Sequence, residues 1–198
     1  MIRVYKVVLG ALLFVVFITN TAFAKSAEPV ESTTPERIDA TVSAKPGKIE
    51  YELPYPGMLP DNPLYFLKTI RDAIVKALIN DPFKRAEFNL LTAQKRMYAA
   101  KFLSEKGKDK LTYETVAKSN NYYHEAIDSI QAVQKNSPKN PAIKPFLNQA
   151  GKVSIKHKEI LAVIKKEIDK KYQKDVLNEE KRLERMKTTI DQMLKLYL

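Results

Sequence analysis

The chain has 198 residues, no cysteine and a formal net charge of +11. This length is typical of one domain. Without cysteine, the chain cannot form disulfides, use a thiol in catalysis or bind zinc through thiolates. The excess of lysine and arginine predicts either solvated helix faces or attraction to an anionic partner such as a lipid headgroup, a wall polymer, a polysaccharide or free DNA.

The first 24 residues have the pattern of a secretory signal peptide. Arg3 and Lys6 are followed by an apolar run over residues 7–18 and by small residues up to Ala24. We predict cleavage after Ala24. An uncleaved N-terminal anchor is the alternative, because the apolar stretch is just long enough to span a bilayer. Both interpretations predict an exported, extracytoplasmic protein that is secreted or associated with the cell envelope.

Residues 25–52 are predicted to form a disordered tether. They are rich in Ser, Thr, Pro, Ala and Glu and show no apolar period, so they cannot bury enough surface to offset the entropy of ordering. The helical domain is predicted to cover residues 53–198. With Arg3, Lys6 and the five acidic and four basic residues of 25–50 set aside, a charge of +10 remains on the rest of the chain.

The first predicted helix follows a proline-rich stretch and covers about residues 63–79. Asp61 or Asn62 can cap it, and Pro63 takes the first helical position, where a missing N–H costs nothing. Its apolar residues recur at helical spacing. We predict that they are core residues, so that a carboxylate at Leu67 would be strongly destabilising: Leu64, Leu67, Ile70, Ile74 and Leu78.

The second predicted helix covers about residues 82–106. Asp81 caps it, Pro82 takes its first position, and Gly107 provides its C-terminal cap. Its apolar face is wide, which is typical of a helix buried between two others. The short spacing between the two capped starts predicts a tight turn and antiparallel neighbours.

The pattern of apolar residues after Gly107 predicts a third helix and a long fourth helix. The third begins after Thr112 as N-cap and ends near Lys135, before a Pro- and Asn-rich breaker. The fourth begins near Pro141 or Pro145. We favour a continuous or kinked helix to the end of the chain over a turn within residues 169–175.

The last part of the chain carries apolar residues in steps of three and four, as in a coiled-coil seam. Such a seam must pack within the chain, which we favour, or mediate self-association. Its members are Val176, Leu183, Met186, Ile190, Met193 and Tyr197. No strand alternation appears. The predicted fold is all-α: an antiparallel bundle of about three helices, followed by a long C-terminal helix that is continuous or kinked.

Two stretches, "LPDNPLYFLKTIRDAI" and "NDPFKRAEFNLLTAQKRMYAAKFLSEKGK", resemble the bacterial domain-of-unknown-function 5667 family over about residues 55–135. The resemblance implies an exported, all-helical domain and no known activity, so it carries no functional residue over. The run "AQKRMYAAKFL" is more basic than the corresponding stretch of the family. The matching residues are Leu59, Pro60, Pro63, Leu64, Tyr65, Leu67, Lys68, Asp81, Pro82, Ala86, Glu87 and Gly107.

Few residue patterns point to chemistry. His124 and Asp128 lie one helical turn apart, but the sequence offers no third metal ligand. His157 falls on an apolar stripe and is predicted to be partly buried in the core. The five glycines form neither a nucleophile elbow nor a phosphate loop. We therefore predict no catalytic, metal or cofactor site and no enzyme activity.

The densest basic run lies in "KKEIDKKYQK". Its candidate polyanion-contacting residues are Lys165, Lys166, Lys170, Lys171 and Lys174. The leading functional prediction is an exported, non-enzymatic interaction or scaffolding module of the bacterial cell envelope, with a partner that is an envelope protein or an anionic wall or membrane component. The alternative is weak electrostatic binding of anionic polymers or anionic membrane surfaces. Sequence-specific nucleic-acid binding is not expected.

Overall fold

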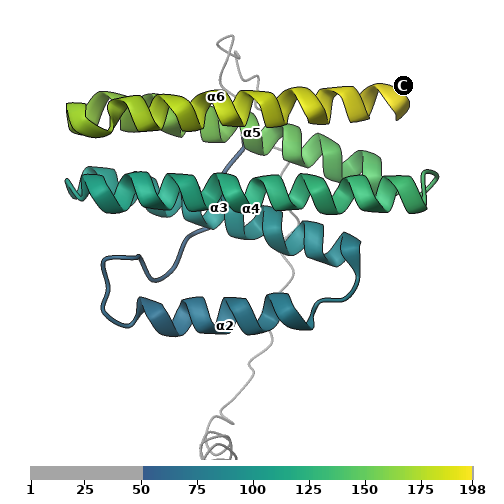
Figure 1. The fold of residues 1–198 in the computed structure, drawn as a ribbon, viewed down its shortest axis with the longest axis horizontal. Coiled ribbons are helices and arrows are strands. Elements are labelled where there is room, and N and C mark those ends of the chain that lie inside the picture. The colour runs from purple at the N-terminus through teal and green to yellow at the C-terminus, as the bar shows by residue number, and fades with distance from the viewer. Residues whose placement is uncertain (1–50, 198) are drawn as a thin grey trace, which may run out of the picture. The chain divides into compact units, whose positions relative to one another are not determined.

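Helices make up most of the part of the chain that this computed structural model describes, residues 51–197 (Figure 1). The predicted signal peptide and residues 25–50 of the predicted tether lie outside this range. No strand occurs within it, which confirms the predicted all-α fold. None of its helices is both long and apolar enough to cross a membrane. The elements are α2 (Tyr65–Leu78), α3 (Pro82–Glu105), α4 (Asp109–Asn136), α5 (Ile143–Glu167), α6 (Lys170–Leu194) and a 3-10 turn (Lys195–Tyr197).

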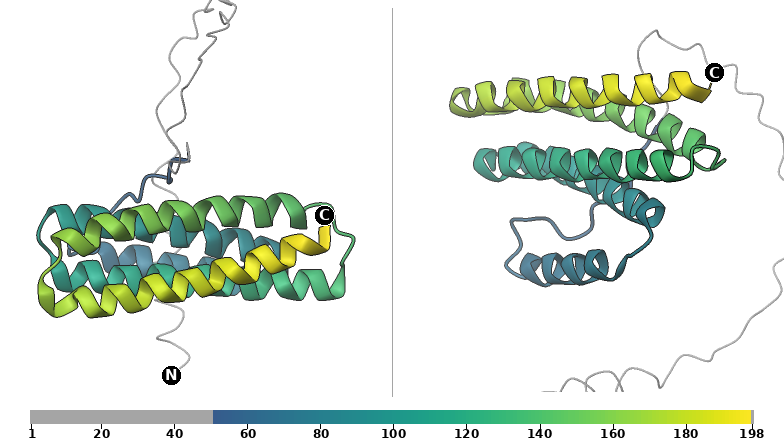
Figure 2. Two further views of the ribbon diagram at one scale, coloured as in Figure 1. Left: turned by 90° about the horizontal axis from the view of Figure 1, so that it is seen from above. Right: turned by 45° about the vertical axis from the view of Figure 1, so that its right-hand side comes forward.

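Helices α3 to α6 form a four-helix bundle built from two antiparallel hairpins (Figures 1 and 2). Helix α3 packs on α4 and α5, and α6 packs on α5 and α4. The α3–α4 and α5–α6 turns lie at one end of the bundle, and the α4–α5 connection lies at the other. The core lies between the four helices, and its largest fully buried side chains include Leu90, Met97, Leu103, Tyr123, Ile130, Ile143, Leu147, Leu161, Ile164, Leu183 and Ile190.

The start of α3 confirms the predicted cap. The Asp81 side chain accepts a hydrogen bond from the backbone N–H of Lys84 at 2.9 Å, and Pro82 is the first helical residue. At the start of α2, the side-chain oxygen of Asn62 accepts from the N–H of Leu64 at 2.9 Å. Helix α2 itself begins at Tyr65, so Pro63 lies in the turn before it.

The α3–α4 turn is a Schellman motif around Gly107. Gly107 has φ +63°, its N–H bonds the carbonyl of Ser104, and the N–H of Lys108 bonds the carbonyl of Leu103. The predicted glycine cap is therefore confirmed. The predicted N-cap at Thr112 is wrong, because the motif lets α4 begin at Asp109, and the Thr112 hydroxyl donates back to the carbonyl of Lys108 inside the helix.

The prediction of a continuous or kinked fourth helix is wrong, and the chain turns at residues 168–169, at the edge of the range 169–175 given as the alternative. Helix α5 ends at Glu167, Ile168 is extended with ψ 147°, and the Asp169 side chain caps α6 by accepting from the N–H of Lys171 at 2.8 Å. Helix α6 then folds back along α5 (Figure 1). The turn is stable because the Ile168 side chain stays buried on the bundle.

The predicted C-terminal seam packs within the chain, as we favoured. Its first five members are buried between the helices, and Tyr197 packs against the same cluster. Self-association through residues 176–197 would need this seam to be exposed, and it is buried. The bundle thus has four helices rather than three followed by one long helix.

Helix α2 lies outside the bundle, beside α3 (Figure 2). The predicted core position of its apolar stripe is wrong, because α2 has no buried residue. The helix is amphipathic, but its polar side faces the bundle. Six apolar residues on the other side are more than half exposed: Leu64, Phe66, Leu67, Ile70, Ile74 and Leu78.

Candidate functional site

A cleft of about 490 Å³ lies between the proline-rich segment (residues 54–60), α2 and α3. Four cations line it, Lys68 and Arg71 from α2 and Lys95 and Arg96 from α3. Among the described residues that line it, Asp72 is the only carboxylate. A concave surface with three more positive than negative side chains attracts anions, because its walls focus the field of the charges. We refer to it as the cationic cleft.

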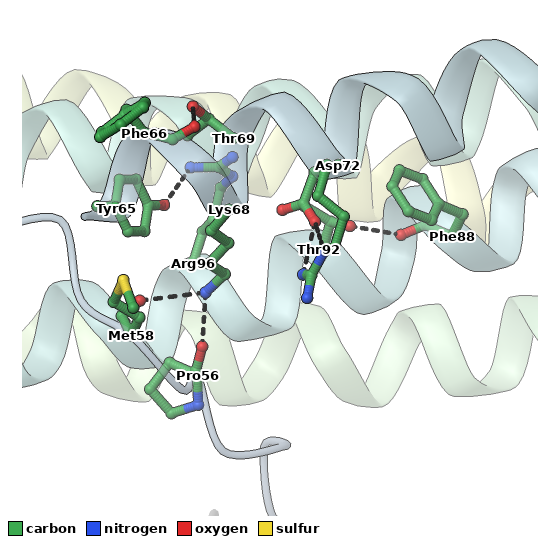
Figure 3. Close-up of polar contacts among 11 residues, drawn as sticks. Pro56, Met58, Tyr65, Phe66, Lys68, Thr69, Asp72, Phe88, Thr92 and Arg96 are labelled. Carbon is green, nitrogen blue, oxygen red and sulfur yellow. Dashed lines mark hydrogen bonds and ion pairs between the residues drawn. The ribbon is translucent and has the colours of Figure 1, made fainter. Parts of the chain in front are cut away.

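Arg96 lies at the base of the cationic cleft. Its side chain is only 8% exposed, and Nη1 donates a hydrogen bond to the hydroxyl of Tyr65 at 2.8 Å (Figure 3). Its guanidinium also lies over the ring of Tyr122, 4.9 Å from the centroid. Nε is buried without a hydrogen-bond partner among the described residues. A buried cation with one neutral acceptor and an unused donor has capacity left for an anion.

Lys68 connects α2 to the proline-rich segment. Its Nζ donates to the carbonyls of Pro56 at 2.6 Å and Met58 at 3.2 Å (Figure 3). Burial lowers the pKa of Lys68, and the neighbouring cations, Arg96 first among them, lower that pKa further, against the opposing effect of Asp72. The prolines and Gly57 (φ +69°) keep this segment out of regular structure, so its carbonyls are free to accept from a lysine.

The remaining cations differ in how far they are neutralised. Arg71 is 68% exposed and pairs with the adjacent Asp72 at 2.7 Å. Lys95 is half-buried, and no ion pair links it to a described carboxylate.

Burial raises the pKa of the Tyr65 hydroxyl, although Arg96 opposes this rise, so Tyr65 remains a neutral acceptor. The cleft can therefore hold a phosphate or carboxylate group, but it lacks an unpaired general base.

The apolar side of α2 continues directly from the mouth of the cationic cleft. Leu64 and Leu67 line the cleft and belong to that side. The opposite side of α2 faces the bundle through polar contacts: Tyr65 bonds Arg96, and Lys76 pairs with Glu125 of α4. An apolar face that no helix within residues 51–197 covers thus borders the cationic cleft.

The five lysines predicted to contact polyanions lie away from the cationic cleft. The α5–α6 turn brings them to one end of the bundle, with two in the last turn of α5 and three in the first turns of α6. Lys165 pairs with Glu180 at 2.6 Å, and Lys171 lies over the ring of Tyr172. Lys166, Lys170 and Lys174 are exposed. Their role as polyanion contacts stays a prediction.

Four of the residues that carry the predicted family resemblance line the cationic cleft: Leu64, Tyr65, Leu67 and Lys68. Asp81 and Pro82 form the start of α3. Sequence reasoning assigned no role to Arg71, Lys95 or Arg96. The signal for the last two was the unusually basic run "AQKRMYAAKFL" in α3. The basic run alone could not predict the cleft, because the cleft forms only when α2 lies over this run in the tertiary structure.

The two histidines lie in contrasting surroundings. His124 Nδ1 is 2.9 Å from Asp128 Oδ2 on an exposed face of α4, and no third His, Cys, Asp or Glu joins them within residues 51–197. His157 is fully buried beside Tyr123, with no partner for either ring nitrogen among the described residues. Burial lowers its pKa to about 3. The core position predicted for His157 is confirmed, and its burial is complete rather than partial.

The fold and the cleft define a class of protein: a helical-bundle domain with a peripheral amphipathic helix. The chain belongs to the family described as Domain of unknown function (DUF5667), whose model matches residues 57–193. The predicted resemblance is confirmed, and the match extends it from about residue 135 through most of α6. No curated protein and no solved structure matches the chain.

Proposed function

We propose that this domain is an exported, non-enzymatic interaction module of the bacterial cell envelope, and that its apolar α2 face is the interaction surface. The observation that carries the proposal is the orientation of α2. A peripheral helix ordinarily turns its apolar side to the core, whereas here the exposed side carries Leu67, Ile70 and Ile74. Contiguous exposed apolar surface is a mark of a binding site.

Two further features support the proposal. The cationic cleft offers positive charge and a neutral hydroxyl, while its one carboxylate is already paired with Arg71. Catalysis of acyl or glycosyl transfer requires a poised acid or base. The signal-like N-terminus supports export.

Weak electrostatic binding of anionic polymers or membrane surfaces is the second candidate function. It is favoured by the cationic cleft and by the lysines at the α5–α6 turn. The two functions differ in what they require. The first needs the apolar face of α2, whereas the second needs only charge and must weaken steeply with salt.

Cysteine accessibility in intact producing cells tests the leading proposal, because the chain has no cysteine of its own. One variant carries Ile74→Cys at the centre of the apolar face. The matched control carries Asn178→Cys at an exposed position of α6. Each is treated with a membrane-impermeant maleimide, first as purified protein and then in cells.

Export predicts that the Asn178→Cys control reacts in intact cells. An interaction at α2 predicts that Ile74→Cys reacts several-fold more slowly than the control in cells, although both react at similar rates in the purified protein. Absence of labelling of the control in intact cells contradicts export. Equal labelling of both positions in cells contradicts an interaction surface on α2.

A further inference from the structure

We propose that α2 binds the surface of an anionic lipid bilayer. Its apolar face would lie at the boundary between headgroups and acyl chains, with a lipid phosphate in the cationic cleft. This inference rests on the proposed function and names the partner of the same surface. Its first support is orientation: the polar contacts of α2 with the bundle, through Tyr65 and Lys76, direct the apolar face away from the protein.

The side chains on this face suit a membrane interface. Helices that lie in the headgroup region combine a face of Phe, Leu and Ile with flanking basic residues. The exposed face of α2 has Phe66, Leu67, Ile70, Ile74 and Leu78, and it has no acidic residue. Arg71 lies at its border, 68% exposed, on the side that opens to the cationic cleft.

Charge complementarity points to anionic lipid. The cleft opens beside the apolar face, so a helix seated at headgroup depth brings Lys95 and Arg71 to the level of lipid phosphates. Arg96 holds a buried, unused Nε at the base of the same cleft. Phosphate is a strong acceptor for such guanidinium and ammonium donors. The charge of +10 on residues 51–198 adds attraction over a longer range.

A second copy of the chain suits the face less well. A helix of 14 residues is about 21 Å long and roughly 10 Å wide, so its exposed strip covers on the order of 200 Å². A stable protein interface buries about 800 Å² on each partner. Two α2 strips meeting face to face would also bring two copies of the basic cleft together. A bilayer has neither restriction, since it is continuous and carries negative charge.

The placement of α2 fits this contact. In Figure 1 and in the right view of Figure 2 it lies on the outer side of α3, and no other helix of the described chain lies beyond it. It can therefore lie flat on a surface while the bundle stays in water. The hydrogen bonds from Lys68 to the carbonyls of Pro56 and Met58 hold the proline-rich segment that precedes α2.

The test uses the full chain with an environment-sensitive fluorophore at a single introduced cysteine. Ile74→Cys carries the probe on the apolar face, and Asn178→Cys carries it on α6 as the control. Vesicles of phosphatidylcholine with 30% phosphatidylglycerol are compared with pure phosphatidylcholine. Because the readout is local, the N-terminal apolar segment can contribute to attachment without mimicking insertion of α2.

On anionic vesicles the probe at position 74 is expected to shift to the blue, increase in intensity several-fold and be quenched by lipids spin-labelled near the headgroup. The probe at position 178 is expected to stay unchanged. Raising the salt concentration from about 50 to about 500 mM should weaken the response, since screening shortens the range of the attraction. An unchanged probe at position 74 on anionic vesicles overturns the proposal.

The role of the cleft is tested with a charge-matched pair of variants carrying the same probe. Arg71→Gln with Lys95→Gln removes two cleft charges but leaves the contacts of Lys68 and Arg96 in place. Lys152→Gln with Lys181→Gln removes two exposed charges elsewhere. A basic residue at an anionic surface contributes a factor of about five. The cleft pair should weaken vesicle binding roughly 10-fold, allowing for the pairing of Arg71 with Asp72, and the control pair much less.

The outcomes separate this inference from the proposed function. If position 74 is protected in cells but unresponsive to vesicles, the interaction module stands and the lipid partner is wrong. If sedimentation shows a dimer that Ile74→Asp dissociates, and vesicles give no response, the partner is a second copy and the lipid proposal is again overturned. If both variant pairs weaken binding equally, the phosphate site in the cleft is wrong.

Discussion

Arg96 of α3 donates its Nη1 hydrogen to the hydroxyl of Tyr65 on α2 over 2.8 Å. This bond matters because α2 has no buried side chain to hold it on the bundle. The contact of α2 with α3 includes this polar pair instead. Helix α2 is therefore expected to be a separate unit of local stability, while α3 to α6 unfold together.

Tyr65→Phe tests that separation. The change leaves the ring in place but removes the acceptor for a guanidinium that is almost fully buried. The lost bond is worth about 1 kcal/mol or more, so protection of the α2 amides against hydrogen exchange should fall by a factor of about 5 or more. Protection within α4 and α5 should not change. Tyr197→Phe, which removes a hydroxyl that donates to Pro138 on the surface, is the control; a uniform fall across all helices would contradict local coupling.

Leu67→Asp is expected to leave the stability of the bundle nearly unchanged, within about 0.5 kcal/mol. Leu67 is 54% exposed, so the carboxylate stays in water. Leu161→Ala, which opens a cavity in the core, should lower the free energy of unfolding by about 2–5 kcal/mol. Urea denaturation followed by circular dichroism measures both. A large loss for Leu67→Asp would show that α2 packs on its apolar side.

In α2, the helix was predicted from the sequence but its orientation was not. Apolar spacing predicted the helix correctly, because Leu67, Ile70 and Ile74 recur on one side whatever covers them. The same spacing could not give the direction in which that side points. The direction in which the apolar side of α2 points depends on contacts between distant parts of the chain, Arg96 with Tyr65 and Lys76 with Glu125. The cationic cleft depends on this direction, so sequence reasoning could not assemble it.

Helix ends were predicted correctly where a single residue fixes the local backbone conformation. Asp81 and Gly107 gave the ends of α3 correctly, through a side-chain cap and a positive φ. The turn at Ile168, next to the alternative range 169–175, was not favoured because it contains neither glycine nor proline. Asp169 was the available signal, since an aspartate can cap a helix start as Asp81 does. Its neighbours continue an apolar pattern, and that pattern favoured a continuous helix.

Asp169→Ala tests the cap that divides α5 from α6. The side chain accepts from the N–H of Lys171 at 2.8 Å, and the loss of such a cap costs about 0.5–2 kcal/mol. Asp175→Ala, a change inside α6 at a position that caps nothing, provides a comparison of equal charge. Thermal or urea unfolding should show the larger loss for Asp169→Ala. Equal losses would mean that the turn does not depend on the cap.

His157 should make the bundle sensitive to acid. Burial lowers its pKa in the folded state to about 3, while in the unfolded chain it is near 6.5. The unfolded state therefore takes up the proton first as the pH falls. The stabilising effect of a neutral His157 is complete above pH 6.5 and decreases progressively between about 6.5 and 3, by at most about 1.4 kcal/mol per pH unit.

His157→Leu should remove this component of the pH dependence, because leucine has a similar volume and does not titrate. It should also be tolerated at neutral pH, since neither ring nitrogen has a partner to lose among the described residues. Urea denaturation at pH 7 and pH 5 measures the difference. His124→Leu is the control at an exposed position. If both variants lose stability with acid as the parent does, His157 is not the sensor.

Heparin affinity distinguishes the two basic surfaces. Substitution of the five lysines at the α5–α6 turn by glutamine should abolish most retention if that end binds polyanions, because released counterions drive such binding. Arg71→Gln with Lys95→Gln should reduce it less, since the cleft has room for a single headgroup rather than an extended polymer. Retention should fall between about 50 and 500 mM salt. Retention that does not depend on salt would contradict an electrostatic mechanism, and elution of the five-lysine variant with the parent would contradict the lysine patch alone.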